Sequence, residues 1–121
     1  EVVGNIDDLT LQENQIELVK AVKSTGVKTV GVFIEGRPRS FYKIEPLLDG
    51  VVMAYLPGEF GGIAISEVLT GKFNPCGRLP FTWPKHPSSH VTYDRKYTEN
   101  VHSDFSMNAF DPQYEFGFGL N

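Results

Sequence analysis

The sequence predicts an α/β fold, in which a mostly parallel sheet is flanked by helices on both faces as a three-layer sandwich. Two observations lead to this prediction. Amphipathic stretches alternate along the chain with short apolar runs that show little alternation, which is typical of helices packed on strands covered on both sides. The connections between them are short, and right-handed crossovers between parallel strands then leave few topologies open.

The first element is a helix predicted over residues 13–24. Its apolar side chains recur at the spacing of one helical face, at Ile16, Leu18, Val19 and Val22. Gly26 lies just past the end, where glycine commonly terminates a helix. Asp7 and Asp8 precede the helix, and we expect them to complement its positive N-terminal end.

The remaining elements alternate between strand and helix. Residues 28–35 are rich in β-branched and aromatic side chains, and residues 51–56 repeat this pattern, so both are predicted as buried strands. Between them, residues 42–48 are expected to form a short helix. Residues 63–70 place apolar side chains on one helical face and predict a further helix, and residues 79–83 are compatible with a short strand.

The chain is interpreted as a single domain spanning residues 1–121, with a core over 9–83 and an ordered, loop-rich tail over 84–121. A chain of 121 residues is large enough to bury a core of its own. The tail is long and irregular but rich in aromatic residues, which favours order because disordered segments are poor in them. The chain begins in a polar stretch without an initiator methionine, so we interpret it as a fragment of a longer protein.

Charge and composition exclude several classes of partner. A formal net charge of -4 argues against nucleic acid, because binding a phosphate backbone requires a basic surface. No apolar run approaches the roughly 20 residues that span a bilayer, so no membrane partner is expected. Cys76 and the three histidines, His86, His90 and His102, have no metal-ligand spacing, and no phosphate-binding glycine motif follows either strand. We therefore expect no metal and no other cofactor.

Four motifs occur in a fixed order along the chain. GRP at 36–38 follows the first predicted strand, AYLPGEFGG occupies 54–62, VLTGKFNPCGRLPFTWP occupies 68–84, and YEFGFGL closes the chain at 114–120. Together they cover nearly the whole chain, and in this order and spacing the sequence resembles the C-terminal α/β sandwich domain of glycoside hydrolase family 3, of the β-glucosidase type.

The resemblance implies a role for the first residue. In that family a loop of this domain carries a glutamate just upstream of a glycine turn and a Leu-Thr-Leu-like helix entry, and this glutamate is the general acid/base. Here Glu1 precedes Gly4, Asn5 and the stretch 9–11, so the resemblance assigns the general acid/base to Glu1. Glu59, in a glycine-rich turn, either borders the sugar pocket or favours the N-terminus of the following helix.

The resemblance also implies a partner and a substrate. The family nucleophile lies on a separate (β/α)8 barrel that precedes this domain and is absent from the chain. With that barrel, the protein is expected to hydrolyse terminal β-D-glucosyl residues of a β-glucoside or β-glucan oligosaccharide by a retaining mechanism, and the isolated chain is expected to be inactive. A β-xylosidase or β-N-acetylglucosaminidase of the same family, and a non-catalytic α/β module packing against a partner domain, are the alternatives.

Other candidate residues have a structural and a functional interpretation. Arg37 and Arg39 follow the end of a strand, where sheets of this class tend to place ligands, yet structural pairing is favoured over a sugar contact. Trp83 lies between prolines and is favoured as a core anchor over a sugar-stacking platform. The compartment stays open, with a periplasmic or secreted parent protein among the options.

Overall fold

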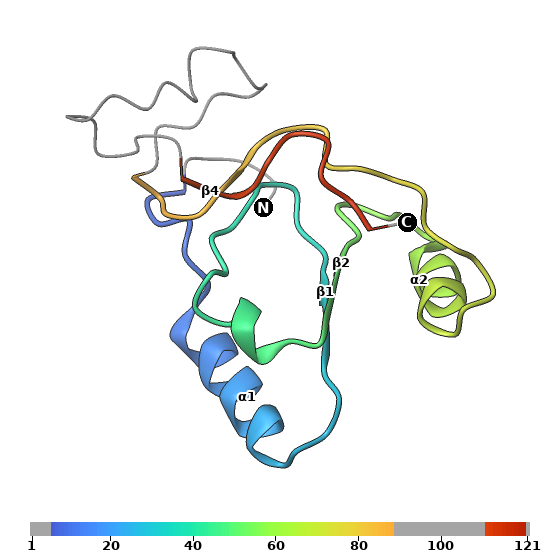
Figure 1. Ribbon diagram of the computed structural model, residues 1–121, viewed down its shortest axis with the longest axis horizontal. Coiled ribbons are helices and arrows are strands. Elements are labelled where there is room, and N and C mark those ends of the chain that lie inside the picture. Colours follow the sequence, from blue (N-terminus) through green and yellow to red (C-terminus); the bar gives the residue numbers. More distant parts are fainter. Residues whose placement is uncertain (1–5, 89–110, 121) are drawn as a thin grey trace. The chain divides into compact units, whose positions relative to one another are not determined.

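The structure, a computed structural model, describes residues 6–88 and 111–120 (Figure 1). The chain divides into two compact units, Glu1–Asn74 (unit 1) and Pro75–Asn121 (unit 2). The elements in chain order are α1 (Glu13–Ser24), β1 (Val30–Phe33), the 3-10 helix η1 (Glu45–Leu47), β2 (Gly50–Met53), α2 (Gly61–Leu69), β3 (Trp83–Pro84) and β4 (Pro112–Tyr114). Unit 1 contains the first five elements, and unit 2 contains β3 and β4.

In unit 1 the strands β1 and β2 form a parallel pair. The register places Val30 opposite Gly50 and Phe33 opposite Met53. Backbone hydrogen bonds continue beyond the strands, because the N–H of Ala54 donates to the carbonyl of Phe33 over 2.9 Å. The crossover between the strands contains η1, where a short helix is predicted over 42–48. The predicted parallel pairing is confirmed.

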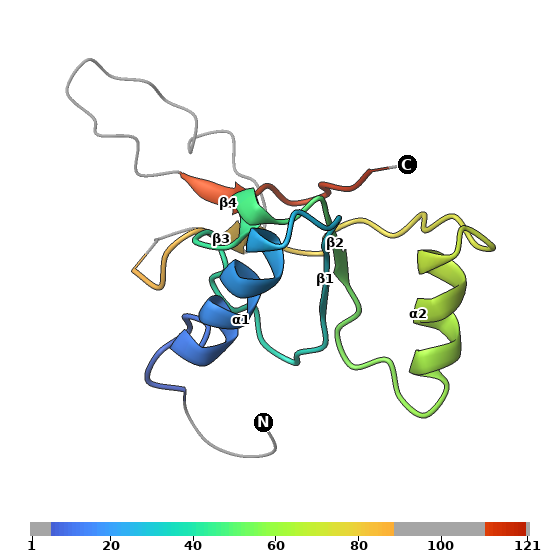
Figure 2. The ribbon, with the colours of Figure 1, turned by 90° about the horizontal axis from the view of Figure 1, so that it is seen from below.

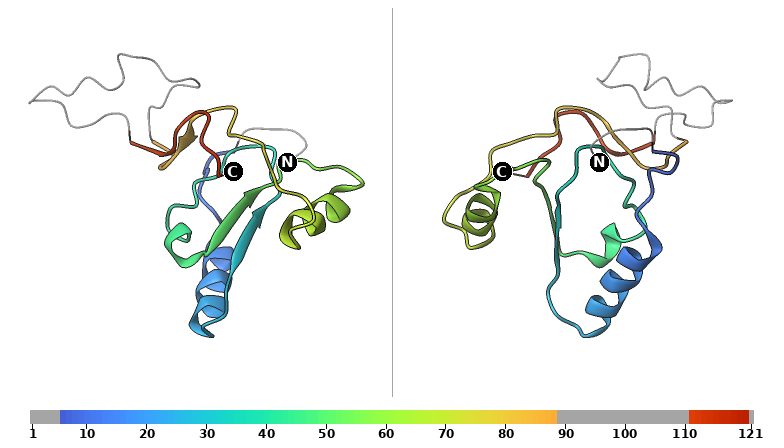
Figure 3. Two further views of the ribbon diagram at one scale, coloured as in Figure 1. Left: turned by 45° about the vertical axis from the view of Figure 1, so that its right-hand side comes forward. Right: turned by 180° about the vertical axis from the view of Figure 1, so that it is seen from behind.

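Helices α1 and α2 lie on opposite sides of the β1–β2 pair, as Figures 2 and 3 show. The α/β class predicted from the sequence is therefore confirmed. The strands are less buried than their composition suggests, since every residue of β2 is half-buried and Val30 of β1 is 49% exposed. Helix α1 packs beside η1, whereas α2 packs closely on no other element within the described part of the chain.

The first helix has the predicted bounds, but neither Asp7 nor Asp8 is its N-cap residue. Gln12 is its N-cap residue and makes no side-chain capping bond. Asp8 does not cap the helix, because its Oδ1 accepts a hydrogen bond from the backbone N–H of Thr10 at 2.8 Å instead. Such a local side-chain bond competes with helix capping. The helix ends as predicted, with Gly26 in the left-handed region at a φ of 78°.

The apolar core of unit 1 joins the chain before α1 to the chain after β1. Four of its side chains are buried, namely Leu11, Ile16, Phe41 and Ile44. The ring of Phe41 packs against that of Phe33 in β1, with 4.5 Å between ring centroids. Residues 9–11 and 40–44 are thereby fixed against α1 and against the strand pair.

A carboxylate closes the amino end of the strand pair. Asp49, which directly precedes β2, accepts hydrogen bonds from the backbone N–H of Thr29 at 2.9 Å and from Lys23 and Lys28 at 3.1 Å each. The Thr29 bond, reinforced by the two ammonium groups, lowers the pKa of Asp49 well below its ordinary value. Asp49 therefore connects the end of α1 to the beginnings of both strands.

In unit 2 the strands β3 and β4 form an antiparallel pair. Trp83 lies opposite Tyr114 and Pro84 opposite Pro112, with a bulge between the two pairs. The short strand expected over 79–83 is thus present as β3 at its end, and β4 lies in the predicted tail. Of that tail, residues 89–110 and 121 lie outside the described residues.

The close of the chain is fixed to the start of unit 2. The N–H of Leu79 donates to the carbonyl of Phe118 and the N–H of Gly117 donates to the carbonyl of Leu79, each at 2.9 Å. The guanidinium of Arg78 donates from Nη1 to the carbonyls of Gly117 at 3.3 Å and Gly119 at 3.4 Å. A side chain at 119 would meet Arg78 at 3.1 Å, so this close approach explains the glycine.

We predict that Asp49→Asn destabilises unit 1 in a pH-dependent way. Because the pKa of Asp49 is lowered in the folded state, its carboxylate contributes its full stabilisation at pH values above its unfolded-state pKa, about 3.9. This stabilisation is lost progressively as the pH falls below that value. Thermal unfolding followed by far-UV circular dichroism should give a lower Tm for the variant at pH 7. The difference from the parent chain should shrink below about pH 4.

The matched control for this experiment is Glu17→Gln. Glu17 pairs with Lys20 on the exposed surface of α1, at 2.7 Å, and exposed pairs contribute little to stability. A Tm change for Glu17→Gln as large as that for Asp49→Asn would contradict the stabilising role assigned to Asp49. A Tm difference for Asp49→Asn that is the same at pH 3 and pH 7 would contradict it as well.

Candidate functional site

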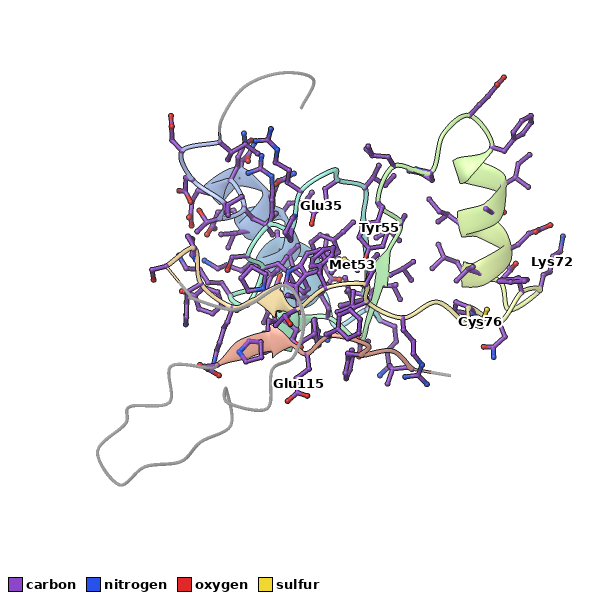
Figure 4. The ribbon with its side chains drawn as sticks, turned by 90° about the horizontal axis from the view of Figure 1, so that it is seen from above. Glu35, Met53, Tyr55, Lys72, Cys76 and Glu115 are labelled. Carbon is purple, nitrogen blue, oxygen red and sulfur yellow. The ribbon has the colours of Figure 1, made fainter. Side chains whose placement is uncertain are left out.

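The carboxyl ends of β1 and β2 meet at one edge of unit 1. Open sheets with parallel strands tend to hold ligands at this edge. Glu35 follows β1 and Tyr55 follows β2, and Figure 4 shows both side chains near this end of the strand pair. The N–H of Glu35 donates to the carbonyl of Tyr55 at 2.9 Å, so the two residues are held together. The candidate site therefore lies at this edge of the strand pair.

Tyr55 adopts a backbone conformation that is unusual for its residue type. Its φ of 52° lies in the left-handed region, which costs a non-glycine residue roughly 1–2 kcal/mol. Strain of this kind persists where the surroundings fix the backbone, and it is often found at functional sites. Burial of the half-buried ring, together with the negative charge of Glu35, raises the pKa of the Tyr55 hydroxyl.

The turn after β1 reverses the chain. The Oε1 atom of Glu35 accepts a hydrogen bond from the backbone N–H of Arg39 at 3.2 Å, which closes a turn around the Gly-Arg-Pro motif at 36–38. Ser40 then meets the start of the chain. Its N–H donates to the carbonyl of Leu9 at 2.8 Å, and it forms a parallel bridge with Thr10.

The side chain of Arg39 strengthens this connection. Its Nη1 donates to the carbonyl of Thr10 at 3.3 Å and to that of Asp8 at 3.5 Å. Hydrogen bonds from Thr10 lower the pKa of the Asp8 carboxyl. The positive charge of Arg39 lowers this pKa by a smaller amount. We refer to Asp8, Leu9, Thr10, Arg39 and Ser40 as the anchor.

Glu1 and Glu59 are the two site residues expected from the sequence. Glu1 lies outside the described residues, so the assignment of the general acid/base to it stays a prediction. Glu59 lies in the exposed turn between β2 and α2. The N-cap residue of α2 is Phe60, without a side-chain capping bond, so Glu59 is not the capping residue. A substrate contact by Glu59 also stays a prediction.

The structural interpretations of two other residues are confirmed. Arg39 donates hydrogen bonds to backbone carbonyls of unit 1, as the preference for structural pairing predicts. The Trp83 side chain has 0% exposure and stacks on Phe81 with 5.4 Å between ring centroids. A sugar cannot stack on a ring face that is fully covered, so Trp83 is a core residue.

Within residues 6–88 and 111–120, no group of three His, Cys, Asp or Glu side chains is placed to hold a metal ion. Cys76 is exposed, and His90 and His102 lie outside the described residues. No helix in these ranges is long and apolar enough to span a membrane.

The anchor is the part of the site that the sequence does not predict. Its hydrogen bonds join residues that are 29 and 31 positions apart in the chain. Asp8 is of a residue type that commonly caps helices, which suggests a different role from the one observed. Arg39 follows the Gly-Arg-Pro motif, and no sequence pattern around it indicates its contacts. Only the general rule that ligands bind at the carboxyl ends of parallel strands points to this edge.

Fold and site together define an α/β domain whose N-terminal segment is anchored at the carboxyl ends of a parallel strand pair. Comparison with known families is consistent with this class, because the family model described as the glycosyl hydrolase family 3 C-terminal domain matches residues 3–121. The chain therefore belongs to the glycosyl hydrolase family 3 C-terminal domain family.

Several curated proteins are similar to the chain over nearly its whole length. A periplasmic β-glucosidase of Salmonella typhimurium is 32% identical over 94% of the chain, and a lysosomal β-glucosidase of Dictyostelium discoideum is 37% identical over 100% of it. A probable β-D-xylosidase 7 of Arabidopsis thaliana is 37% identical over 94% of the chain. The chain spans only 14% to 16% of the length of these relatives.

We predict that Trp83→Ala lowers the free energy of unfolding of the chain by about 3–5 kcal/mol, the range for removing a large buried aromatic side chain. Trp83→Phe should cost less, because part of the ring volume is kept. Denaturant unfolding followed by far-UV circular dichroism measures both. Leu120→Ala serves as the control, since this side chain is 83% exposed and its removal should change little. Equal stability of Trp83→Ala and the parent chain would refute the core assignment.

Proposed function

We propose that the chain is part of a glycoside hydrolase that removes terminal β-D-glucosyl residues with retention of configuration, and that Glu1 is its general acid/base. Membership of the family and the names of the relatives support the reaction class. The observation that supports the placement of the acid is the anchor, which ties the segment following Glu1 to the carboxyl ends of β1 and β2.

The proposed mechanism requires two carboxyl groups about 5–5.5 Å apart. One attacks the anomeric carbon and displaces the leaving alcohol, while the other, Glu1, donates a proton to the leaving oxygen. Glu1 then removes a proton from the water that hydrolyses the glycosyl-enzyme intermediate. We assign the nucleophile to a (β/α)8 barrel elsewhere in the parent protein. This chain spans only 14% to 16% of the length of the relatives, so a parent protein of similar length would have enough further residues to form such a barrel.

The acid must be protonated when the substrate binds. A neighbouring carboxylate disfavours ionisation of a second one and raises its pKa, as does burial. In the proposed assembly, the approach of the barrel nucleophile to Glu1 supplies both effects. The isolated chain lacks that neighbour and is therefore expected to be inactive.

The anchor limits where Glu1 can be. Glu1 precedes Asp8 by seven positions, and a fully extended chain of that length spans at most ~25 Å. Because Asp8 is hydrogen-bonded to Arg39 beside the turn after β1, the Cα of Glu1 lies within about that distance of the Cα of Asp8. We propose that the rest of the site assembles near this edge.

The surface around α2 supports packing against the rest of a larger protein. Five large apolar side chains within or beside this helix are each more than half exposed, namely Leu56, Phe60, Ile63, Leu69 and Phe73. Contiguous exposed apolar surface usually marks an interaction site. We assign the covering partner to other parts of the same polypeptide, the barrel among them.

Glu59 is a second proposed site residue. It lies in the turn that follows the carboxyl end of β2, where ligands of α/β domains bind, and its exposed carboxylate is available to accept hydrogen bonds from sugar hydroxyls. A Glu59→Gln variant of the parent protein should raise KM for the glycoside more than it lowers kcat, because a ground-state contact would be weakened.

Hydrolysis of a terminal β-D-xylosyl residue is the second candidate. It is favoured by the relative named a probable β-D-xylosidase, which matches as large a share of the chain as the Salmonella enzyme. The ratio of kcat/KM for aryl β-glucoside and aryl β-xyloside in the parent protein decides between the two. The names of the periplasmic and lysosomal relatives favour a parent protein that works outside the cytosol.

We predict that Glu1→Gln in the parent protein lowers kcat/KM by about 10²–10⁴-fold for an alkyl β-glucoside, the usual contribution of general acid catalysis. For 2,4-dinitrophenyl β-glucoside the loss should be small, because this leaving group departs without protonation. Glu17→Gln, which changes an exposed glutamate on α1, is the control and should leave both values unchanged. Equal losses for both substrates would remove Glu1 from the acid role.

A second prediction concerns the isolated chain. Alone it should show no hydrolysis of an aryl β-glucoside, and co-expression with the barrel of its parent protein should restore hydrolysis. Restored activity that is lost with Glu1→Gln supports the catalytic role. Association of the two parts without activity supports the alternative of a non-catalytic α/β module, and activity of the chain alone would contradict both.

A further inference from the structure

We propose that Arg39 is a positioning residue for the general acid/base, holding the segment that leads to Glu1 in register with the carboxyl ends of β1 and β2. This inference rests on the proposed role of Glu1. Arg39 itself makes no contact with substrate in the proposal, and it acts only through the backbone of residues 8–10.

The contacts of the anchor are concentrated close to Glu1 in the sequence. Among the described residues, 8–10 is the part nearest to Glu1 whose backbone is hydrogen-bonded to another segment of unit 1. One of these bonds joins backbone to backbone, from Ser40 to Leu9 at 2.8 Å. The other two come from the guanidinium of Arg39. The Arg39 side chain thus adds two hydrogen bonds to the backbone connection, which also includes the parallel bridge between Thr10 and Ser40.

The geometry of the Arg39 guanidinium suits this function. Its two carbonyl partners, on Asp8 and Thr10, lie on either side of Leu9, and a planar guanidinium can reach both from a single nitrogen. Hydrogen bonds from a charged donor are stronger than neutral ones, although distances of 3.3 and 3.5 Å are at the long end of the range. They should restrict the register of the segment more than they stabilise the fold.

Glu35 fixes the other side of the arrangement. Its Oε1 accepts the backbone N–H of Arg39 at 3.2 Å, and its own N–H is bonded to Tyr55 at 2.9 Å. The path of contacts therefore runs from the strand pair through Glu35 and the 36–38 turn to Arg39, and from there to the segment that leads to Glu1. Each step in this path is a hydrogen bond between described residues.

A change in this path should affect the proton-transfer step specifically. A general acid must be within hydrogen-bond reach of the leaving oxygen, and a displacement of about 1 Å can cost 10²-fold in rate. With the Ser40 backbone bond intact, loss of the Arg39 side chain should loosen the segment without detaching it. Substrates whose leaving group needs protonation should suffer most.

The test uses Arg39→Ala and Arg39→Lys in the full-length parent protein. We expect Arg39→Ala to lower kcat/KM by about 10–100-fold for an alkyl β-glucoside, with a change of less than about threefold for 2,4-dinitrophenyl β-glucoside. Arg39→Lys keeps the charge but replaces the two fixed N–H groups of Nη1 with a compact ammonium on a flexible stem, so its loss should be intermediate. The inhibition constant Ki of a competitive sugar inhibitor should not change, because the binding surface is untouched.

Arg78 provides a matched control. Its Nη1 also donates to two backbone carbonyls at similar distances, on Gly117 and Gly119, but within unit 2. Arg78→Ala removes the same kind of contact and should lower thermal stability. The ratio of kcat/KM between the dinitrophenyl and alkyl substrates should stay at the value of the parent protein.

The outcomes separate the two proposals. Equal losses for both substrates in Arg39→Ala would reduce Arg39 to a structural residue and overturn the inference. If the loss of kcat/KM depends on the leaving group for Glu1→Gln but not for Arg39→Ala, only the inference about Arg39 fails. If the loss for Glu1→Gln does not depend on the leaving group, the proposed acid role itself fails. Should Arg39→Ala not fold, Arg39→Lys and Glu35→Ala carry the same test, with the same pattern of losses expected.

Discussion

The parallel pairing of β1 with β2 is the constraint on which the rest of unit 1 depends. Four residues in each strand bury little surface, so the pair relies on the turns at its two ends. A carboxylate closes each end by accepting a backbone N–H: Asp49 accepts that of Thr29, and Glu35 accepts that of Arg39. In both places a side-chain acceptor satisfies a backbone donor that the short ladder cannot reach.

The elements with a strong local signal are those that the sequence predicts well. Helix α1 has the predicted bounds because its apolar stripe and its terminal glycine act within the segment itself. The two strands are predicted in the correct order, and their observed ends lie inside the predicted ranges or one residue beyond them. Strand β4 was not predicted, because a strand of three residues that begins with proline has no detectable alternation.

The site is predicted less completely than the fold, for a physical reason. The resemblance to a family indicates Glu1 through its neighbours in sequence, which is a local signal. The anchor instead depends on contacts between residues about 30 positions apart, and these follow only from the turn that Glu35 closes. Asp8 shows the difficulty, since its bond to Thr10 and a helix cap are alternatives for the same side chain.

With Glu1 as the proposed acid, the positions of the two carboxylates would separate stability from catalysis in this unit. Asp49 precedes β2 and Glu35 follows β1, so they lie at opposite ends of the strand pair. Asp49 joins elements that are remote from the anchor, whereas Glu35 leads directly to it. The acid of a glycosidase must lie within hydrogen-bond reach of the leaving oxygen, whereas the fold tolerates small displacements. Small displacements at the carboxyl end of the strand pair should therefore affect activity before they affect stability.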